Sequence, residues 1–134
     1  MATTAVSERL QAAMNAHDID AFVDCFADDY RSEQPAHPDR AFGGRGQVRA
    51  NWSEIFAEVP TSKENSFAWR SRRGKSGASG ESLERPNGSK MEMRGVIING
   101  IRESRIVWAR LYLEMVEGGG AGIAAAVHRI TGKD

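Results

Sequence analysis

Two strand-like runs around a tight polar turn decide the fold of this chain; residues 91–116 read MEMRGVIINGIRESRIVWARLYLEMV. A two-residue turn at Glu103 and Ser104 fixes the register of a β-hairpin, because the turn determines which residues lie opposite one another. The pairs predicted from this turn are Arg102 with Arg105, Ile101 with Ile106, Ile97 with Arg110, and Gly95 with Tyr112.

This register gives the predicted hairpin two different faces. The aromatic and charged face comprises Met93, Gly95, Ile97, Trp108, Arg110, Tyr112 and Glu114. The aliphatic face comprises Val96, Ile98, Ala109, Leu111, Leu113 and Met115. Since the two faces of a strand alternate in sequence, we expect the first to line a selective pocket and the second to pack against another surface.

Composition narrows the class of protein. At 134 residues, the chain forms a single domain over residues 1–134. Eighteen basic and 18 acidic residues balance, which predicts neither a nucleic-acid nor a membrane partner. Cys25 is the only cysteine and is expected to be a buried small apolar residue, so no internal disulfide forms. Three scattered histidines predict no metal site, we expect no cofactor, and the absence of a signal-peptide core at residues 1–7 predicts a cytoplasmic location.

Helical periodicity dominates the first half of the chain. Residues 4–16 form an amphipathic helix, and Asp18 caps a second short helix that ends at Asp28 and Asp29. A short strand covers residues 30–34, and a third helix runs from Val48 until Pro60 stops it. After Gly118–Gly120 a short tail helix carries Ile123, Val127 and Ile130. Helices followed by a meander of strands indicate the α+β class.

Three blocks in this order carry a family resemblance. They are Phe26-Ala27-Asp28-Asp29-Tyr30, then Phe42-Gly43-Gly44-Arg45-Gly46-Gln47-Val48-Arg49 with Trp52, and finally Gly95-Val96 through Arg105-Ile106-Val107. Together they resemble the SnoaL-like family of the NTF2-like superfamily, whose members include polyketide cyclases, steroid isomerases, epoxide hydrolases and proteins with no known reaction. The resemblance implies a cone in which N-terminal helices pack on a curved antiparallel sheet around an apolar cavity, followed by a short C-terminal helix. It also implies a two-fold homodimer formed through the outer face of the sheet.

Residues 61–85 do not fit this resemblance, which implies two further strands there. From Arg70 to Glu81 no aliphatic residue is larger than Ala78, and the composition is typical of a flexible linker. One hypothesis is a pair of compensating frameshifts, because a neighbouring reading frame can encode two alternating strands. The other is a genuine mobile insertion over the mouth of the cavity.

Four residues are candidates for catalysis. Glu114 aligns with a carboxylate that many relatives of the family keep on their last strand, and an apolar cavity would make it a usable acid or base. His37 is a second candidate base, while Arg110 and Tyr112 would stabilise developing oxyanion charge. Gln34 stands where steroid isomerases carry their proton-shuttling aspartate, so that mechanism is disfavoured. The alternative interpretation is an exposed Glu114–Arg110 ion pair and a histidine on a surface loop.

Six further residues are expected to contact a ligand: Tyr30, Glu33, Trp52, Phe56, Gly95 and Trp108. Such a pocket suits a small, mostly apolar molecule with a carbonyl or hydroxyl group. Two functions fit it. The first is cofactor-free acid–base catalysis of the cyclase, isomerase or hydratase type, and the second is a non-catalytic ligand-binding or dimeric assembly module.

Overall fold

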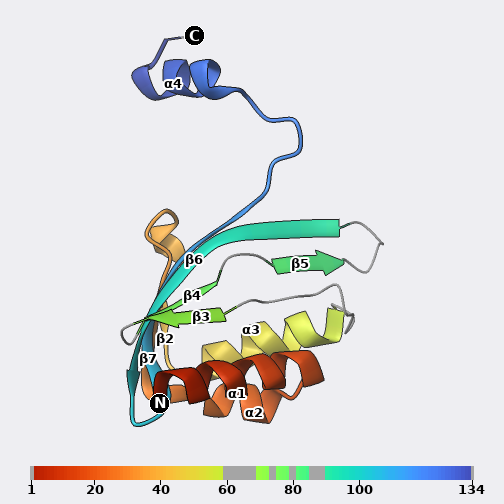
Figure 1. Cartoon of the computed structure of the whole chain (residues 1–134), viewed down its shortest axis with the longest axis vertical. Coiled ribbons are helices and arrows are strands. Elements are labelled where there is room, and N and C mark those ends of the chain that lie inside the picture. Colours follow the sequence, from red (N-terminus) through yellow and green to blue (C-terminus); the bar gives the residue numbers. More distant parts are fainter. Residues whose placement is uncertain (1, 59–68, 73–74, 79–80, 85–89, 134) are drawn as a thin grey trace.

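The computed structural model describes residues 2–58, 69–72, 75–78, 81–84 and 90–133 (Figure 1). The helices are α1 (Ala2–Ala16), α2 (Ile19–Asp24), α3 (Arg45–Glu58) and α4 (Ile123–Thr131), with a 3-10 turn, η1, at Pro38–Arg40. The strands are β1 (Phe26–Glu33), β2 (Phe42–Gly43), β3 (Trp69–Arg72), β4 (Lys75–Ala78), β5 (Glu81–Glu84), β6 (Lys90–Arg102) and β7 (Arg105–Met115).

Five of these strands form one curved sheet in the order β2-β1-β7-β6-β5, and β3 and β4 form a separate two-stranded sheet. The pairs in the large sheet are antiparallel except that β1 runs parallel to β7. Helices α1, α2 and α3 lie on one side of the sheet, whereas α4 stands away from the body (Figure 1). The predicted α+β cone is confirmed, with a parallel pair inside an otherwise antiparallel sheet. None of the described helices has the length and apolarity needed to cross a bilayer.

The first two helices follow their sequence signals. Val6, Leu10 and Ala13 bury the predicted stripe of α1. The Asp18 carboxylate accepts a hydrogen bond from the Ala21 backbone N–H at 3.1 Å, which is the predicted N-cap of α2.

The predicted end of the second helix was wrong. Helix α2 stops at Asp24, and the backbone N–H of Cys25 closes it by donating to the carbonyls of Phe22 and Val23. The chain then enters β1, so Asp28 and Asp29 are exposed strand residues that pair with Arg45 and Arg102 at 2.7 and 2.9 Å. Cys25 is fully buried, as predicted.

Strands form within the segment whose composition predicts a linker. β3 pairs with β4 from Trp69–Ala78 to Arg72–Lys75, and β5 pairs with the start of β6. These residues are therefore paired strands although their composition is typical of a linker, because ladder hydrogen bonds to a neighbouring strand override a weak side-chain preference. The rest of residues 61–85 lies outside the described residues, and the frameshift stays a hypothesis about the gene.

The hairpin of β6 and β7 has the predicted turn but a different register. Glu103 and Ser104 occupy the turn with φ of 51° and 61°, and the pairs Arg102–Arg105 and Ile101–Ile106 are confirmed. Gly100 then pairs with Trp108, which leaves Val107 as an extra residue in β7. This bulge moves every later pair by one residue, so the two predicted pairs of Ile97 and Gly95 were wrong.

The slip exchanges the two faces of β7. Ile97 now lies opposite Leu111, and Asn99 lies opposite Ala109. The helix-covered inner face carries Ile97, Asn99, Ala109, Leu111 and Leu113. The outer face carries Val96, Ile98, Trp108, Arg110, Tyr112 and Glu114. Three residues of the predicted packing face, Ala109, Leu111 and Leu113, therefore belong to the interior.

Candidate functional site

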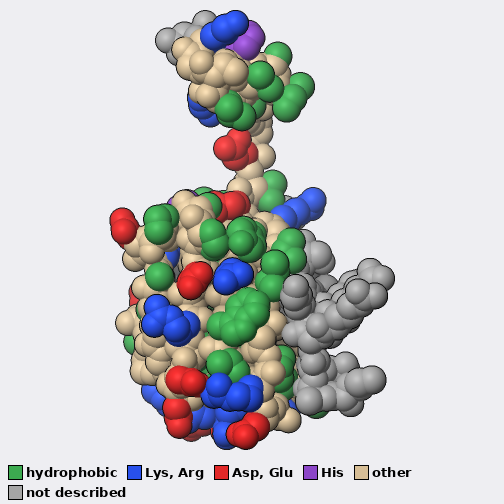
Figure 2. Space-filling view, turned by 90° about the vertical axis from the view of Figure 1, so that its left-hand side faces the viewer, with side chains coloured by type: hydrophobic (Ala, Val, Ile, Leu, Met, Phe, Trp, Pro, Cys, Tyr) green, Lys and Arg blue, Asp and Glu red, His purple; other side chains and the backbone are tan. Residues whose placement is uncertain are grey.

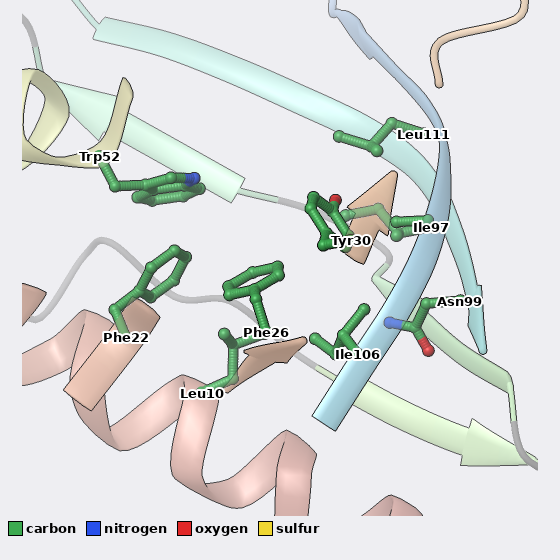
Figure 3. A pocket seen from close by; sticks show the side chains of 10 residues that line it. Leu10, Phe22, Phe26, Tyr30, Trp52, Ile97, Asn99, Ile106 and Leu111 are labelled. Carbon is green, nitrogen blue, oxygen red and sulfur yellow. The ribbon is translucent and has the colours of Figure 1, made fainter. Parts of the chain in front are cut away.

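A small apolar cavity lies between the helices and the inner face of the sheet (Figure 3). Its volume is about 80 Å³, well below that of a pocket for a drug-sized molecule. The described residues that line it come from α1, α2, β1, α3, β6 and β7: Leu10, Phe22, Phe26, Tyr30, Trp52, Ile97, Asn99, Ile106, Ala109 and Leu111.

Four aromatic rings form one wall of this cavity. The Phe22 ring lies 4.5 Å from the Trp52 ring and 5.3 Å from the Phe26 ring, measured between centroids. The Tyr30 ring meets Phe26 edge-on at 4.8 Å. Short helix α2 presents Phe22 toward Trp52 of α3, and the start of β1 adds Phe26 and Tyr30. These edge-on and tilted contacts fix the ring positions, so the wall is preorganised.

Tyr30 supplies a hydrogen-bond donor in the wall. Its side chain is 4% exposed, and the desolvation that accompanies burial raises the pKa of the phenol, against the smaller opposing effect of a hydrogen bond with Ser32. A phenol with a raised pKa keeps its proton at neutral pH. Tyr30 can therefore donate to a carbonyl or hydroxyl oxygen of a guest.

Asn99 supplies the second polar group. It is 2% exposed, and its Oδ1 has no hydrogen-bond partner among the described residues. Figure 3 shows its amide at the Ile106 edge of the cavity, with the nitrogen turned toward Ile106 and the oxygen turned away from the aromatic rings. A buried amide oxygen without a partner is unfavourable by about 1–3 kcal/mol, and native folds retain few such groups. Among the described lining residues, Asn99 is thus the one whose buried polar side chain leaves an oxygen without a hydrogen bond.

Charged side chains are absent from the described cavity lining. They gather instead beside Cys25, where Arg9, Arg45 and Arg105 lie 3.2, 3.7 and 2.9 Å from the Asp24 carboxylate. Hydrogen bonding from Arg105 holds the pKa of Asp24 below its ordinary value. Across the described part of the chain, no three His, Cys, Asp or Glu side chains gather closely enough to hold a metal ion.

The four catalytic candidates lie on or beside the outer face. His37 Nε2 is 2.7 Å from Glu114 Oε1, so the structure brings those two residues together across 77 positions of sequence. Arg110 lies 3.6 Å from Glu33 and stacks over Trp108 at 5.2 Å, while Tyr112 is 43% exposed. The prediction that Arg110 and Tyr112 face the cavity was wrong, because the bulge at Val107 turns them outward. The predicted Glu114–Arg110 pair is replaced by two pairs, Glu114 with His37 and Arg110 with Glu33.

Of the six predicted ligand contacts, Tyr30 and Trp52 line the cavity. Phe56 is partly buried behind Trp52, at a ring distance of 5.7 Å. Glu33 and Trp108 are on the outer face. Gly95 has a φ of 153°, and a Cβ there would overlap the backbone of Tyr112. Glycine is therefore required by the backbone conformation and by the close approach of the neighbouring strand, and it does not make room for the Tyr112 ring.

Sequence reasoning missed most of the aliphatic wall and Asn99. A signal for Asn99 was present, because a lone amide two positions after Ile97 lies on the same face of an otherwise apolar strand. Leu111 and Ala109 were assigned to the packing face of the hairpin because the residues of the turn give no indication of the bulge at Val107.

Known proteins share the sequence pattern and the fold of this chain. The family model described as the SnoaL-like domain matches residues 7–109, well over half of the chain. The chain belongs to the SnoaL-like family. No curated protein matches this SnoaL-like chain.

Solved structures share the fold of the SnoaL-like domain. A proposed ketosteroid isomerase from Kribbella flavida DSM 17836 has a TM-score of 0.66 and 12% identity over 90% of this chain and 82% of its own. A proposed SnoaL-like polyketide cyclase from Shewanella denitrificans OS-217 has a TM-score of 0.67 and 10% identity over 84% and 90%. An NTF2-like protein of unknown function from Burkholderia xenovorans LB400 has a TM-score of 0.61 and 19% identity over 94% and 91%. At such identities the likeness shows the fold alone.

Proposed function

We propose that this SnoaL-like domain binds a small, mostly apolar molecule with one carbonyl or hydroxyl oxygen in the cavity under its sheet. The observation that carries the proposal is the buried Asn99 amide, whose oxygen has no partner among the described residues although it lies in the wall of an apolar cavity. Once the amide rotates about χ2 and turns its oxygen toward the cavity, a guest with a hydroxyl group would complete that hydrogen bond and remove the cost of leaving it unmade.

Tyr30 and Asn99 provide the cavity with hydrogen-bonding groups of complementary kinds. The phenol donates, and the amide both accepts and donates, so a single oxygen atom or an adjacent pair can be held from two sides. Ile97 lies between them (Figure 3) and, together with Leu111, contributes only apolar surface. With no charged group in the described lining, an ionised guest would lose its hydration without gaining a partner.

The size of the cavity limits the guest. At about 80 Å³ the cavity is smaller than the roughly 150 Å³ that holds a benzene ring, so a single-ring guest requires side chains of the wall to move apart and a four-ring skeleton is excluded. The Phe22, Phe26 and Trp52 rings offer flat or edge-on contacts to such a ring. A substituted monocyclic ketone or phenol matches the chemistry of the wall and is the largest guest that we propose.

The lining of the cavity favours binding of the guest without a chemical reaction. Acid–base catalysis needs a base within reach of the guest. The described lining offers a protonated phenol and an amide, and neither is a base at neutral pH. Glu114 and His37 lie across the sheet from the cavity, and we assign them no role in it.

A thermal-shift titration tests this proposal with acetophenone, phenol and benzoate as probes. We expect the two neutral compounds to raise the melting temperature of the full chain and benzoate to leave it unchanged. Tyr30→Phe should weaken acetophenone binding about 5–10-fold, the effect of one hydrogen bond. Tyr112→Phe makes the same chemical change on the outer face and is the matched control. Equal affinities in the parent, Tyr30→Phe and Tyr112→Phe would rule the site out.

A further inference from the structure

Ser32 carries a buried hydroxyl group next to the cavity, although it is not one of the described lining residues. It is 3% exposed and lies on β1 two positions after Tyr30, so both side chains point to the inner side of the sheet, with their Cα atoms about 6.5–7 Å apart. A hydroxyl group removed from water needs a hydrogen-bond partner. The neighbours of Ser32 therefore indicate which group it serves.

Apolar residues flank Ser32 across the sheet. It pairs with Phe42 of β2 on one side and with Ala109 of β7 on the other, and neither side chain can form a hydrogen bond. Asn99 lies one strand further, opposite Ala109, so its Cα is about 9–10 Å from that of Ser32. Because side chains stand roughly perpendicular to a sheet, Ser32 and Asn99 do not meet over Ala109. This agrees with an Asn99 Oδ1 that has no partner among the described residues.

Along β1, the polar neighbours on the same face are Tyr30 and Gln34. Gln34 follows the last residue of the strand, and its Oε1 accepts a hydrogen bond from Arg40 at 3.0 Å. Tyr30 precedes Ser32, and a hydrogen bond joins the two side chains. Ser32 is thus connected to the phenol that lines the cavity.

The direction of this hydrogen bond follows from its effect on the phenol. Burial raises the pKa of Tyr30, and the hydrogen bond with Ser32 opposes that rise. A hydrogen bond that favours the phenolate is one that the phenol oxygen accepts, so Ser32 is the donor and the proton of Tyr30 stays available. Edge-on contacts of the Tyr30 ring with Phe26 at 4.8 Å and Phe42 at 6.0 Å hold the phenol in place.

We propose that Ser32 is the positioning residue of the binding site: its hydroxyl donates to the Tyr30 oxygen and directs the Tyr30 proton to the oxygen of the guest. The inference rests on the proposed function, in which Tyr30 donates to that oxygen. A phenol that accepts one hydrogen bond becomes a stronger donor in the next, because hydrogen bonds in a chain polarise one another. The gain grows with the strength of the acceptor, so Ser32 favours a ketone over an alcohol as the guest.

Acetophenone titrations of full-length variants at neutral pH test this coupling. Ser32→Ala should weaken binding about 3–5-fold, and Ser32→Thr, which keeps the hydroxyl group, should restore most of the affinity. In a Tyr30→Phe background, Ser32→Ala should weaken binding no further, because the hydroxyl acts through the phenol. Ser53→Ala makes the same change at an exposed position of α3 and is the matched control. A loss of equal size in both backgrounds would overturn the proposal, since Ser32 would then act on the fold alone.

Titration of the phenol itself provides a measurement that needs no guest. The chain has two tyrosines, so in a Tyr112→Phe background the ultraviolet absorbance of tyrosinate reports Tyr30 alone. Tyr112 is 43% exposed on the outer face of the sheet. Viewed from the side of β7 and β1, hydrophobic side chains are interspersed among charged ones (Figure 2), so phenylalanine at position 112 should be tolerated.

In that background Ser32→Ala should raise the pKa of Tyr30, because the hydrogen bond that favours the phenolate is lost, whereas Ser53→Ala should leave it unchanged. An unchanged or lowered pKa in Ser32→Ala would refute the hydrogen bond and the proposal with it. A raised pKa in a chain that does not bind acetophenone would refute the proposed function, and with it the role of Ser32 toward a guest. The two failures are therefore distinguishable.

Discussion

Replacing Asn99 by leucine should make the fold more stable and the binding of an oxygen-bearing guest weaker. The side chain is 2% exposed, its Oδ1 has no partner among the described residues, and its opposite neighbour Ala109 is small. Leucine has the same branching and the same number of heavy atoms, needs no hydrogen bond, and can extend its larger methyl groups into the adjacent cavity. The substitution thus removes an unfavourable buried polar group without creating a cavity.

The expected gain follows from the cost of the unmade hydrogen bond. An unsatisfied buried amide costs about 1–3 kcal/mol, so Asn99→Leu should raise the free energy of unfolding by about 1–2 kcal/mol. For a domain of this size that corresponds to roughly 3–6 °C in melting temperature. Such a gain would show that the polar side chain at position 99 lowers the stability of the fold, as residues that serve a binding function often do.

Urea denaturation of the parent and the variant measures this difference, with the midpoint and slope compared separately. Asn51→Leu is the matched control, because Asn51 accepts a hydrogen bond from Gln47 at 2.6 Å on the surface of α3 and should gain nothing from leucine. With acetophenone at 100 times its dissociation constant, the parent should gain about 2.7 kcal/mol and Asn99→Leu clearly less. A loss of more than about 1 kcal/mol in Asn99→Leu would show that the amide is satisfied in solution, and the argument would fail.

Three further predictions concern the turn, the Asp24 cluster and the gene. Ser104→Gly should stabilise the chain by about 1 kcal/mol in the same urea assay, because residue 104 has a φ of 61° that glycine adopts without strain; a loss would contradict the turn geometry. Asp24→Asn should cost less than about 1 kcal/mol at pH 7, since Asp24 is 55% exposed. The folded pKa of Asp24 lies below its ordinary 3.8, so this difference should be constant above about pH 5 and vanish as the pH falls through that lowered pKa; a difference that grows in acid would reverse the sign. Sequencing the gene should reveal two compensating shifts around codons 61–85, and a gene whose neighbouring frames encode no alternating strands would exclude that hypothesis.

Features controlled by neighbouring residues could be predicted from the sequence. The stripe of α1 and the Asp18 cap of α2 depend on spacings of three and four residues along one chain. The two-residue turn at Glu103 and Ser104 depends on local polarity between two apolar runs. The cone was implied by the resemblance of three sequence blocks to the SnoaL-like family and not by these local signals.

The composition of the candidate site was decided by the tertiary structure. A single extra residue, Val107, exchanges the faces of β7, and a bulge is chosen by how the strand fits its partner and the helices, not by the turn. His37 and Glu114 meet across 77 residues, so no local pattern reports their contact. Asn99 could be placed on a face by counting along the strand, but its missing hydrogen bond depends on everything packed around it. Sequence periodicity determines which residues share a face of one element, whereas the packing of elements determines which face becomes the interior.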